Sequence, residues 1–114
     1  MPLLKINTNR KLDDTRAMHL LDEASRTVAE ALGKPESYVM VDLSDGRHMS
    51  FAGDTSPLAS LELKSLGLPE EQTPELSAVL CRLVSDALGI PGERIYIEFS
   101  SPQRHMWGWD GRTF

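Results

Sequence analysis

The sequence has little of what several common classes of protein require. Its 114 residues include one cysteine, Cys81, so neither a disulfide within the chain nor a metal site built on a cysteine pair can form. No apolar run approaches the roughly 20 residues that a membrane-spanning helix needs. The opening Met1 to Lys5 lacks the charged and apolar regions of a signal peptide. We therefore expect no membrane partner and a cytoplasmic protein, with secretion independent of a signal peptide as an alternative.

Basic residues are also few. The chain has 12 Lys and Arg against 17 Asp and Glu, a formal net charge of -5. Because binding to a phosphate backbone usually needs a basic surface, no nucleic-acid partner is expected. His19, His48 and His105 lie in three separate segments without metal-ligand spacing, and we interpret them as surface or polar-network residues. We therefore expect no metal site.

An internal repeat is the most informative feature that the sequence does have. Ala31 to Pro35 (ALGKP) recurs 56 positions later as Ala87 to Pro91 (ALGIP). At the same offset, Val39 to Ser44 matches Ile95 to Ser100 in type and spacing. The length suits one packed core. We therefore predict a single domain over residues 1–114, built from two strand-helix-strand copies at about residues 2–56 and 57–114.

The middle of each copy carries apolar residues with the 3.6-residue period of an amphipathic helix. Asp13 or Asp14 is expected to cap the first helix, and Thr73 the second. Gly33 and Gly89 are expected to end the two helices in the left-handed conformation. The apolar stripes are Ala17, Leu20, Leu21, Ala24, Val28, Ala31 and Leu32 in the first copy, and Leu76, Val79, Leu80, Leu83, Val84, Ala87 and Leu88 in the second.

In the strand after each helix, apolar side chains recur at every second position, so one face of the strand is apolar and is expected to receive the helices. The opposite faces mix apolar with polar residues, which suits a subunit interface. These observations predict an α/β fold: a mainly four-stranded sheet with both helices on one face and other copies of the chain on the other. Short extra strands are expected at residues 47–51 and around 107–109. The apolar faces carry Val39, Val41 and Leu43, then Ile95, Ile97 and Phe99; the opposite faces carry Tyr38, Met40 and Asp42, then Tyr96 and Glu98.

Short segments along the whole chain carry a further signal. They are Met1-Pro2, Asn7-Thr8-Asn9, Gly33-Lys34-Pro35 with Tyr38, Met49 to Gly53, Lys64 to Gly67, Arg94 to Ile97 and Trp107 to Phe114. In this order, and with the repeat, they resemble the macrophage migration inhibitory factor family. The resemblance implies a homotrimer whose three sheets surround a channel, with active sites between subunits. It also implies cofactor-free keto-enol tautomerisation of arylpyruvates, such as phenylpyruvate, and of dopachrome-like compounds.

The same resemblance assigns Pro2 as the catalytic base. Once Met1 is removed, the secondary amine of Pro2 is basic, and α-amino groups start from a pKa near 8. Retained Met1 would make that nitrogen a non-basic amide. Lys34 matches the lysine that holds the substrate carboxylate, and Leu66 a position whose backbone N–H contacts the same group. The alternatives are a solvated cation beside a helix end for Lys34 and core packing for Leu66.

The remaining matches form the walls of the pocket. Tyr96 and Phe114 match aromatic walls, with Tyr38 near the mouth, and aromatic rings suit a flat apolar substrate. Glu98 stands where vertebrate members have an asparagine, and a carboxylate cannot donate to a phenolic substrate. Trp107 replaces a smaller aliphatic residue at the pocket edge and should narrow it or add a stacking surface.

Two other functions compete with the enzyme. Family members also act as cytokine-like signals, so a receptor-binding protein is one alternative, and a scaffold trimer with weak or vestigial tautomerase activity is the other. Vertebrate members carry a Cys-x-x-Cys where this chain has Leu58 to Leu61, so a thiol-disulfide activity has no residues to perform it. Cys81, between Leu80 and Leu83, is expected to be a small core residue.

Overall fold

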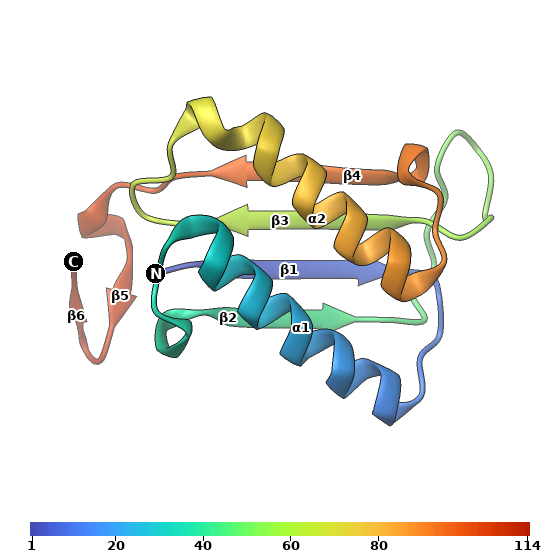
Figure 1. The fold of residues 1–114 in the computed structure, drawn as a ribbon, viewed down its shortest axis with the longest axis horizontal. Coiled ribbons are helices and arrows are strands. Elements are labelled where there is room, and N and C mark those ends of the chain that lie inside the picture. The colour runs from blue at the N-terminus through green and yellow to red at the C-terminus, as the bar shows by residue number, and fades with distance from the viewer.

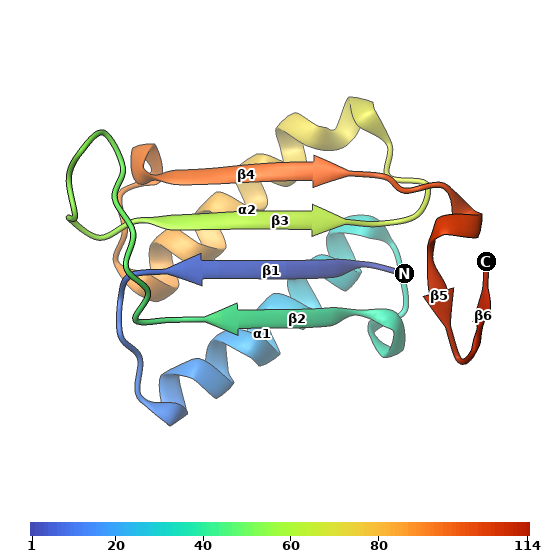
Figure 2. The same ribbon diagram turned by 180° about the vertical axis from the view of Figure 1, so that it is seen from behind.

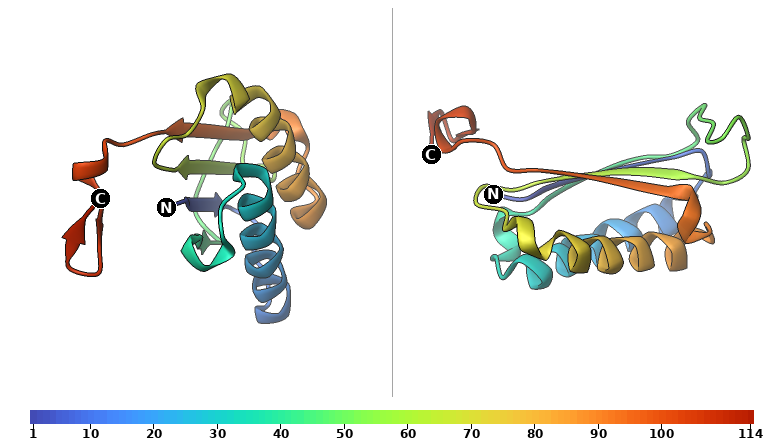
Figure 3. Two further views of the ribbon diagram at one scale, coloured as in Figure 1. Left: turned by 60° about the vertical axis from the view of Figure 1, so that its left-hand side comes forward. Right: turned by 90° about the horizontal axis from the view of Figure 1, so that it is seen from above.

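The computed structural model describes residues 1–114 as one sheet with two helices packed on it (Figure 1). A short hairpin follows at the C-terminus and projects beyond the end of the sheet, beside the N-terminus (Figure 3). No helix combines the length and apolarity needed to cross a membrane. In chain order the elements are β1 (Leu3–Thr8), α1 (Asp14–Leu32), β2 (Met40–Ser44), β3 (Ala59–Lys64), α2 (Thr73–Leu88), β4 (Ile95–Ser100), β5 (Gly108–Trp109) and β6 (Arg112–Thr113).

The sheet has the strand order β2-β1-β3-β4. β1 pairs with β2 in parallel, and β3 with β4 in parallel, so each sequence copy forms one strand-helix-strand unit. The two units join through an antiparallel pairing of β1 with β3. Both helices cover the same face, and the other face is bare when the molecule is seen from behind (Figure 2). The predicted repeat and four-stranded sheet are confirmed.

Both helices end as predicted. Gly33 and Gly89 take φ values of 63° and 66°, in the left-handed region. Asp13 caps α1, because its side chain accepts a hydrogen bond of 2.8 Å from the backbone N–H of Arg16. Thr73 as the cap of α2 is wrong. A 3-10 turn runs directly into the helix, so Thr73 already has helical backbone angles and its hydroxyl turns back to the carbonyl of Glu70 at 2.8 Å.

The core fills the space between the sheet and the helices. The side chains that alternate toward the helices on β1 and β3 are almost fully buried, as are the central members of the apolar stripes on α1 and α2. The other stripe members are half-buried: Ala17, Leu21, Ala31 and Leu32 on α1, and Val79 and Ala87 on α2. The predicted inward faces of β2 and β4 pack against this core at its edges. Burial of apolar area is the main favourable term in folding. The repeat therefore stabilises the chain because the apolar faces of its two copies form one common core. Central members are Leu4, Ile6, Leu20, Val28, Leu61, Leu63, Leu80 and Val84.

The bare face of the sheet has the mixed character that the sequence predicts. Met40 and Tyr96 are 65% and 69% exposed there. The ring of Tyr96 packs on that of Phe51, with 4.7 Å between centroids. A row of charged residues also crosses the four strands. Its members occupy paired positions: Asp42, Lys5, Glu62 and Glu98.

The two expected extra strands have different outcomes. Residues 47–50 form no strand, and Phe51 makes only an isolated bridge to Asp54, so this prediction is wrong for the single chain. Positive φ angles at Ala52 and Gly53 turn the backbone on itself and leave the preceding residues no strand to pair with. The strand around 107–109 is confirmed as β5. It pairs with β6 through the two-residue loop Asp110-Gly111, whose positive φ angles suit a tight hairpin.

Candidate active site

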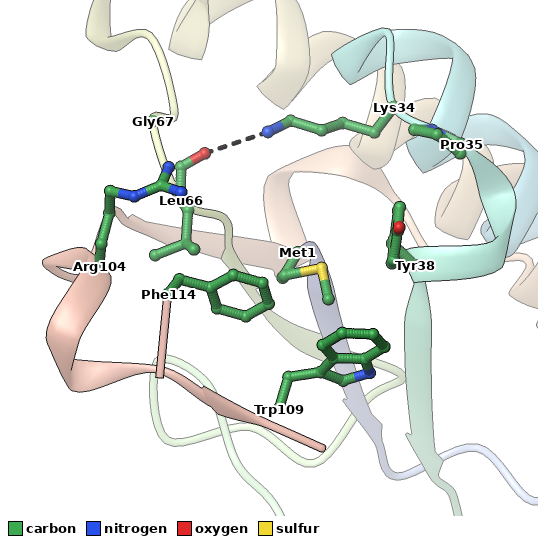
Figure 4. A pocket seen from close by; sticks show the side chains of 9 residues that line it. All are labelled: Met1, Lys34, Pro35, Tyr38, Leu66, Gly67, Arg104, Trp109 and Phe114. Carbon is green, nitrogen blue, oxygen red and sulfur yellow. Dashed lines mark hydrogen bonds between the residues drawn. The ribbon is translucent and has the colours of Figure 1, made fainter. Parts of the chain in front are cut away.

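A pocket of about 470 Å³ opens at the end of the sheet where the N-terminus begins (Figure 4). Four segments that are distant in sequence meet there: the N-terminus, the exit of α1, the turn after β3 and the C-terminal hairpin. Nine residues line it: Met1, Lys34, Pro35, Tyr38, Leu66, Gly67, Arg104, Trp109 and Phe114.

Lys34 is placed in the pocket by the way α1 ends. The N–H of left-handed Gly33 bonds to the carbonyl of Glu30, and the N–H of Lys34 bonds to that of Ala29 at 2.9 Å. This is the Schellman arrangement, which fixes the direction of the residue after the glycine. The Nζ of Lys34 then donates a hydrogen bond of 3.2 Å to the carbonyl oxygen of Leu66.

Leu66 belongs to the turn that follows β3. Its side chain is buried, and its backbone N–H takes no part in the backbone hydrogen bonds of the loops and turns. The next residue, Gly67, has a φ of 67°, which allows the chain to reverse toward α2. The turn therefore presents its backbone carbonyl to the Lys34 ammonium. The N–H of Leu66 is left free, and this is the group that the predicted contact with the substrate carboxylate needs.

Three aromatic rings form another wall of the pocket. Tyr38 meets Trp109 edge to face at 6.3 Å, and Trp109 stacks near Phe114 at 6.1 Å. The final residue is held in place, because the N–H of Phe114 donates to the carbonyl of Trp107 at 3.2 Å. These contacts hold the C-terminal tail against the end of the sheet and bring Trp109 and Phe114 to the pocket together.

Pro2 lies beside this pocket rather than in it. Pro2 is buried, and its carbonyl accepts a bond of 3.0 Å from the N–H of Met40, which extends the pairing of β1 with β2. With Trp107 it lines a neighbouring pocket of about 380 Å³. Both pockets share Met1, Tyr38 and Trp109, and the Met1 side chain stands at the centre of the first one in Figure 4.

The electrostatic character of the pocket is cationic. Lys34 and Arg104 line it, and no Asp or Glu side chain does. The pKa of the N-terminal amine, here that of Met1, is held below its ordinary value, first by burial and then by repulsion from Lys34 and Arg104. An amine in this place is therefore unprotonated at lower pH than a free one. No cluster of three metal-ligating side chains occurs in the chain.

The predicted site residues divide into three groups. Lys34, Leu66, Tyr38 and Phe114 meet in the pocket, and Pro2 and Trp107 adjoin it. Tyr96 and Glu98 are not brought there by their own chain, because both lie on the bare face of β4. The register pairs Tyr96 with Ser60, which in turn pairs with Asn7. Asn7 is five residues from Pro2 along β1, so Tyr96 lies level with a point about 16 Å along the sheet from Pro2.

Arg104 is the pocket residue that the sequence reasoning missed. It begins a 3-10 turn between β4 and β5, a segment with no periodicity from which its direction can be inferred. Trp109, whose match to the family's tryptophan is equally compatible with a packing role and a pocket role, lines the pocket.

A doubled strand-helix-strand sheet with a pocket beside the N-terminus defines a protein with the tautomerase superfamily fold. The chain belongs to the macrophage migration inhibitory factor family, whose model, described as Macrophage migration inhibitory factor (MIF), matches residues 1–114.

Individual relatives agree over the full length. The chain is 38% identical to a macrophage migration inhibitory factor homolog of Brugia malayi over 115 aligned residues, which cover 100% of this chain and 99% of the relative. A crystal structure of the homologue from Prochlorococcus marinus has a TM-score of 0.93 and 42% identity, over 98% of each chain. The factor from Trichinella spiralis has a TM-score of 0.90 and 34% identity, over 98% of this chain and 99% of that one.

Proposed function

We propose that this protein is a cofactor-independent keto-enol tautomerase of arylpyruvates, with the amine of Pro2 as its base after Met1 is removed. The observation that carries the proposal is the order of groups in the pocket. Met1, at the amino end of the chain, stands between the charged groups of Lys34 and Arg104 on one side and the rings of Tyr38 and Trp109 on the other, with the Phe114 ring beside it. An arylpyruvate has the matching order: ring, acidic carbon, carbonyl and carboxylate.

The reaction moves one proton. With the carboxylate on Lys34 and the ring against the aromatic wall, C3 of the substrate faces the amine. The neutral amine takes a proton from C3, the C–H electron pair forms the C2–C3 double bond, and the carbonyl pair moves onto the C2 oxygen. The ammonium then returns its proton to that oxygen, which gives the enol. Burial and the two cations lower the pKa of the Met1 amine, and the same influences would favour the neutral form of a Pro2 amine.

Loss of Met1 changes the site in two ways. It converts the Pro2 nitrogen from an amide to a basic secondary amine. It also removes the side chain that lies at the junction of the two pockets, both of which Met1 lines. The processed site would then extend from Lys34 to Trp107 with the new amine between them, where Pro2 is held by its hydrogen bond from Met40.

The proposal includes a homotrimer, because two of the residues that we assign to the site do not reach the pocket of their own chain. Tyr96 and Glu98 stay on the bare sheet face, at a distance from their own pocket, and Tyr96 and Met40 expose apolar surface there. A neighbouring copy that covers this face can supply both side chains. Dopachrome-like substrates are a weaker proposal than phenylpyruvate, because the Glu98 carboxylate cannot donate to a polar group at the far end of the pocket and repels anions.

One sample tests the assignment. Intact mass shows whether Met1 is absent, and phenylpyruvate is then followed spectroscopically as its keto and enol forms interconvert. We expect enzyme-dependent interconversion by the processed protein, and none by a matched preparation in which Met1 is retained by a blocking N-terminal extension. Equal activity of the two preparations would contradict Pro2 as the base. No activity in a fully processed trimer would favour the cytokine-like or scaffold alternative.

A further inference from the structure

Arg104 is the second cation of the pocket and has no partner in the chain. It starts the 3-10 turn Arg104–Met106, and its guanidinium approaches the turn at Leu66 and Gly67 from the side opposite Lys34 (Figure 4). Its side chain makes none of the hydrogen bonds of the chain, and it is absent from the ion pairs, which are His19–Glu23, Arg26–Asp22 and Arg112–Asp110. The guanidinium is therefore free to bind a ligand.

Lys34 and Arg104 share one end of the pocket, while the aromatic rings of Tyr38 and Trp109 lie at the other (Figure 4). A substrate whose ring rests on the aromatic end and whose C3 lies at the amine must direct both its carboxylate and its C2 oxygen toward the cations. Those two oxygen-bearing groups are adjacent in any 2-oxo acid. The pocket thus offers one cation to each of them.

The two cations of the pocket match the two negative charges of the transition state better than the single negative charge of the bound substrate. The bound 2-oxo acid has one negative charge, on the carboxylate. When the amine removes the C3 proton, the carbonyl electron pair moves to the C2 oxygen and the substrate gains a second negative charge at the same end. Interactions that strengthen only in the transition state raise kcat, whereas those made equally in the ground state lower KM.

We propose that Arg104 is a catalytic residue that stabilises the negative charge developing on the C2 oxygen, while Lys34 holds the carboxylate. This inference rests on the proposed tautomerase function. It assigns the two cations different kinetic roles, although they line the same pocket. Arg104 contributes mainly to kcat, and Lys34 mainly to KM.

Kinetics on phenylpyruvate test the division of roles. We expect Arg104→Gln to lower kcat by about 10- to 100-fold with KM changed by less than about threefold. This is less than the roughly 100- to 1000-fold for complete loss of one donor to an oxyanion, because Gln can still donate a hydrogen bond but carries no charge. Arg104→Lys should recover part of the loss because it restores the charge. Arg16→Gln is the matched control, since Arg16 is exposed at the start of α1, at the other end of the molecule. A raised KM with unchanged kcat for Arg104→Gln would overturn the inference.

A binding measurement separates this inference from the function on which it rests. Benzylmalonate presents two carboxylates at one end and imitates the charge of the transition state, whereas 3-phenylpropanoate presents one. By calorimetry, Arg104→Gln should weaken benzylmalonate by about tenfold or more and 3-phenylpropanoate by less than about threefold. Equal weakening of both ligands would make Arg104 a general attractor of anions and overturn the inference.

The outcomes are distinguishable. If the wild type tautomerises phenylpyruvate and Arg104→Gln matches it in kcat, the inference is wrong and the proposed function stands. If the processed wild type is inactive and does not prefer benzylmalonate over 3-phenylpropanoate, both are wrong.

Discussion

The Nζ of Lys34 donates a hydrogen bond of 3.2 Å to the carbonyl oxygen of Leu66, and this bond joins the two sequence copies at the pocket. Lys34 follows the helix of the first copy, and Leu66 follows the first strand of the second. The bond occupies one of the three protons of the ammonium and leaves the others for a ligand. It therefore aims Lys34 at the site without neutralising its charge.

Replacing Lys34 tests this arrangement. Lys34→Ala should reduce kcat/KM for phenylpyruvate by about 1.5 to 3 kcal/mol, the range for a hydrogen bond to a charged group, mainly through KM. The fold should persist, because the side chain is only partly buried and the Leu66 carbonyl can be hydrated instead. Lys11→Ala removes an exposed lysine elsewhere and serves as the control. If kcat/KM of Lys34→Ala equals that of the control, Lys34 does not bind substrate.

The repeat explains why so much of the fold could be predicted. Apolar periodicity and the two glycines fix the helices, because Gly33 and Gly89 occupy equivalent places and both take left-handed angles. The copies diverge one residue later, where Lys34 enters the pocket and its counterpart Ile90 is buried in the core. That difference was readable from polarity alone, since a lysine cannot occupy a dry core without a partner.

The parts that could not be predicted depend on contacts that no local pattern encodes. Arg104 reaches the pocket because an irregular segment folds back toward the Leu66 turn, and that path has neither the period of a helix nor that of a strand. The Thr73 error has the same origin, since the preceding 3-10 turn moves the helix start by one residue. The proposed roles of Tyr96 and Glu98 require another copy of the chain, whose position no local pattern encodes.

The proposed trimer predicts the mass in solution and a shared site. Light scattering at micromolar concentration should give about 38 kDa, three times the 12.7 kDa of one chain. Tyr96→Ala should keep its fold, since the side chain is 69% exposed in the single chain, but lose activity because the neighbouring pocket loses a wall. A stable, active monomer would contradict the shared site.

A mixing experiment sharpens this test. Tyr96→Ala impairs the pocket of a neighbour, whereas Lys34→Ala impairs the pocket of its own chain. Co-refolded mixtures of the two variants should therefore contain some intact sites and show more activity than either variant alone. A mixture that shows only the average of the two activities would place Tyr96 in the pocket of its own chain or in no pocket.

Cys81 should matter for stability rather than for catalysis. It is half-buried on α2, and its Sγ lies 3.9 Å from the carbonyl of Gly92, at the edge of the core and on neither of the pockets beside the N-terminus. Cys81→Ser places a more polar group there and should lower the free energy of unfolding by about 1 kcal/mol, measured by urea denaturation. Its kcat/KM should equal that of the wild type. Loss of activity in a trimer of normal stability would give Cys81 a catalytic role.

The pH profile of kcat/KM tests the base itself, and the sign follows from the pocket. Burial and repulsion from Lys34 and Arg104 lower the pKa of the Met1 amine, and we expect the same influences to lower the pKa of the Pro2 amine once Met1 is removed. The processed protein should thus show a limb that rises with pH and is centred below about 8, the value of a free α-amino group. Pro2→Gly, with a primary amine, should show a weakened or shifted limb, and a blocked amine should abolish activity.

The two cations also predict how the limb moves, which separates the amine from any other titrating group. Removing a positive charge near the amine stabilises its ammonium form, so Lys34→Ala and Arg104→Gln should each raise the pKa and shift the limb to higher pH. We expect the larger shift for Lys34→Ala, because Lys34 repels the Met1 amine more strongly than Arg104 does. Arg16→Gln should leave the limb in place.

The Glu98 carboxylate of a neighbouring copy acts in the opposite sense, so Glu98→Gln should move the limb to lower pH if that side chain lies near the amine. A limb that moves with neither Lys34→Ala nor Arg104→Gln would belong to a group outside the pocket, and Pro2 would then not be the base.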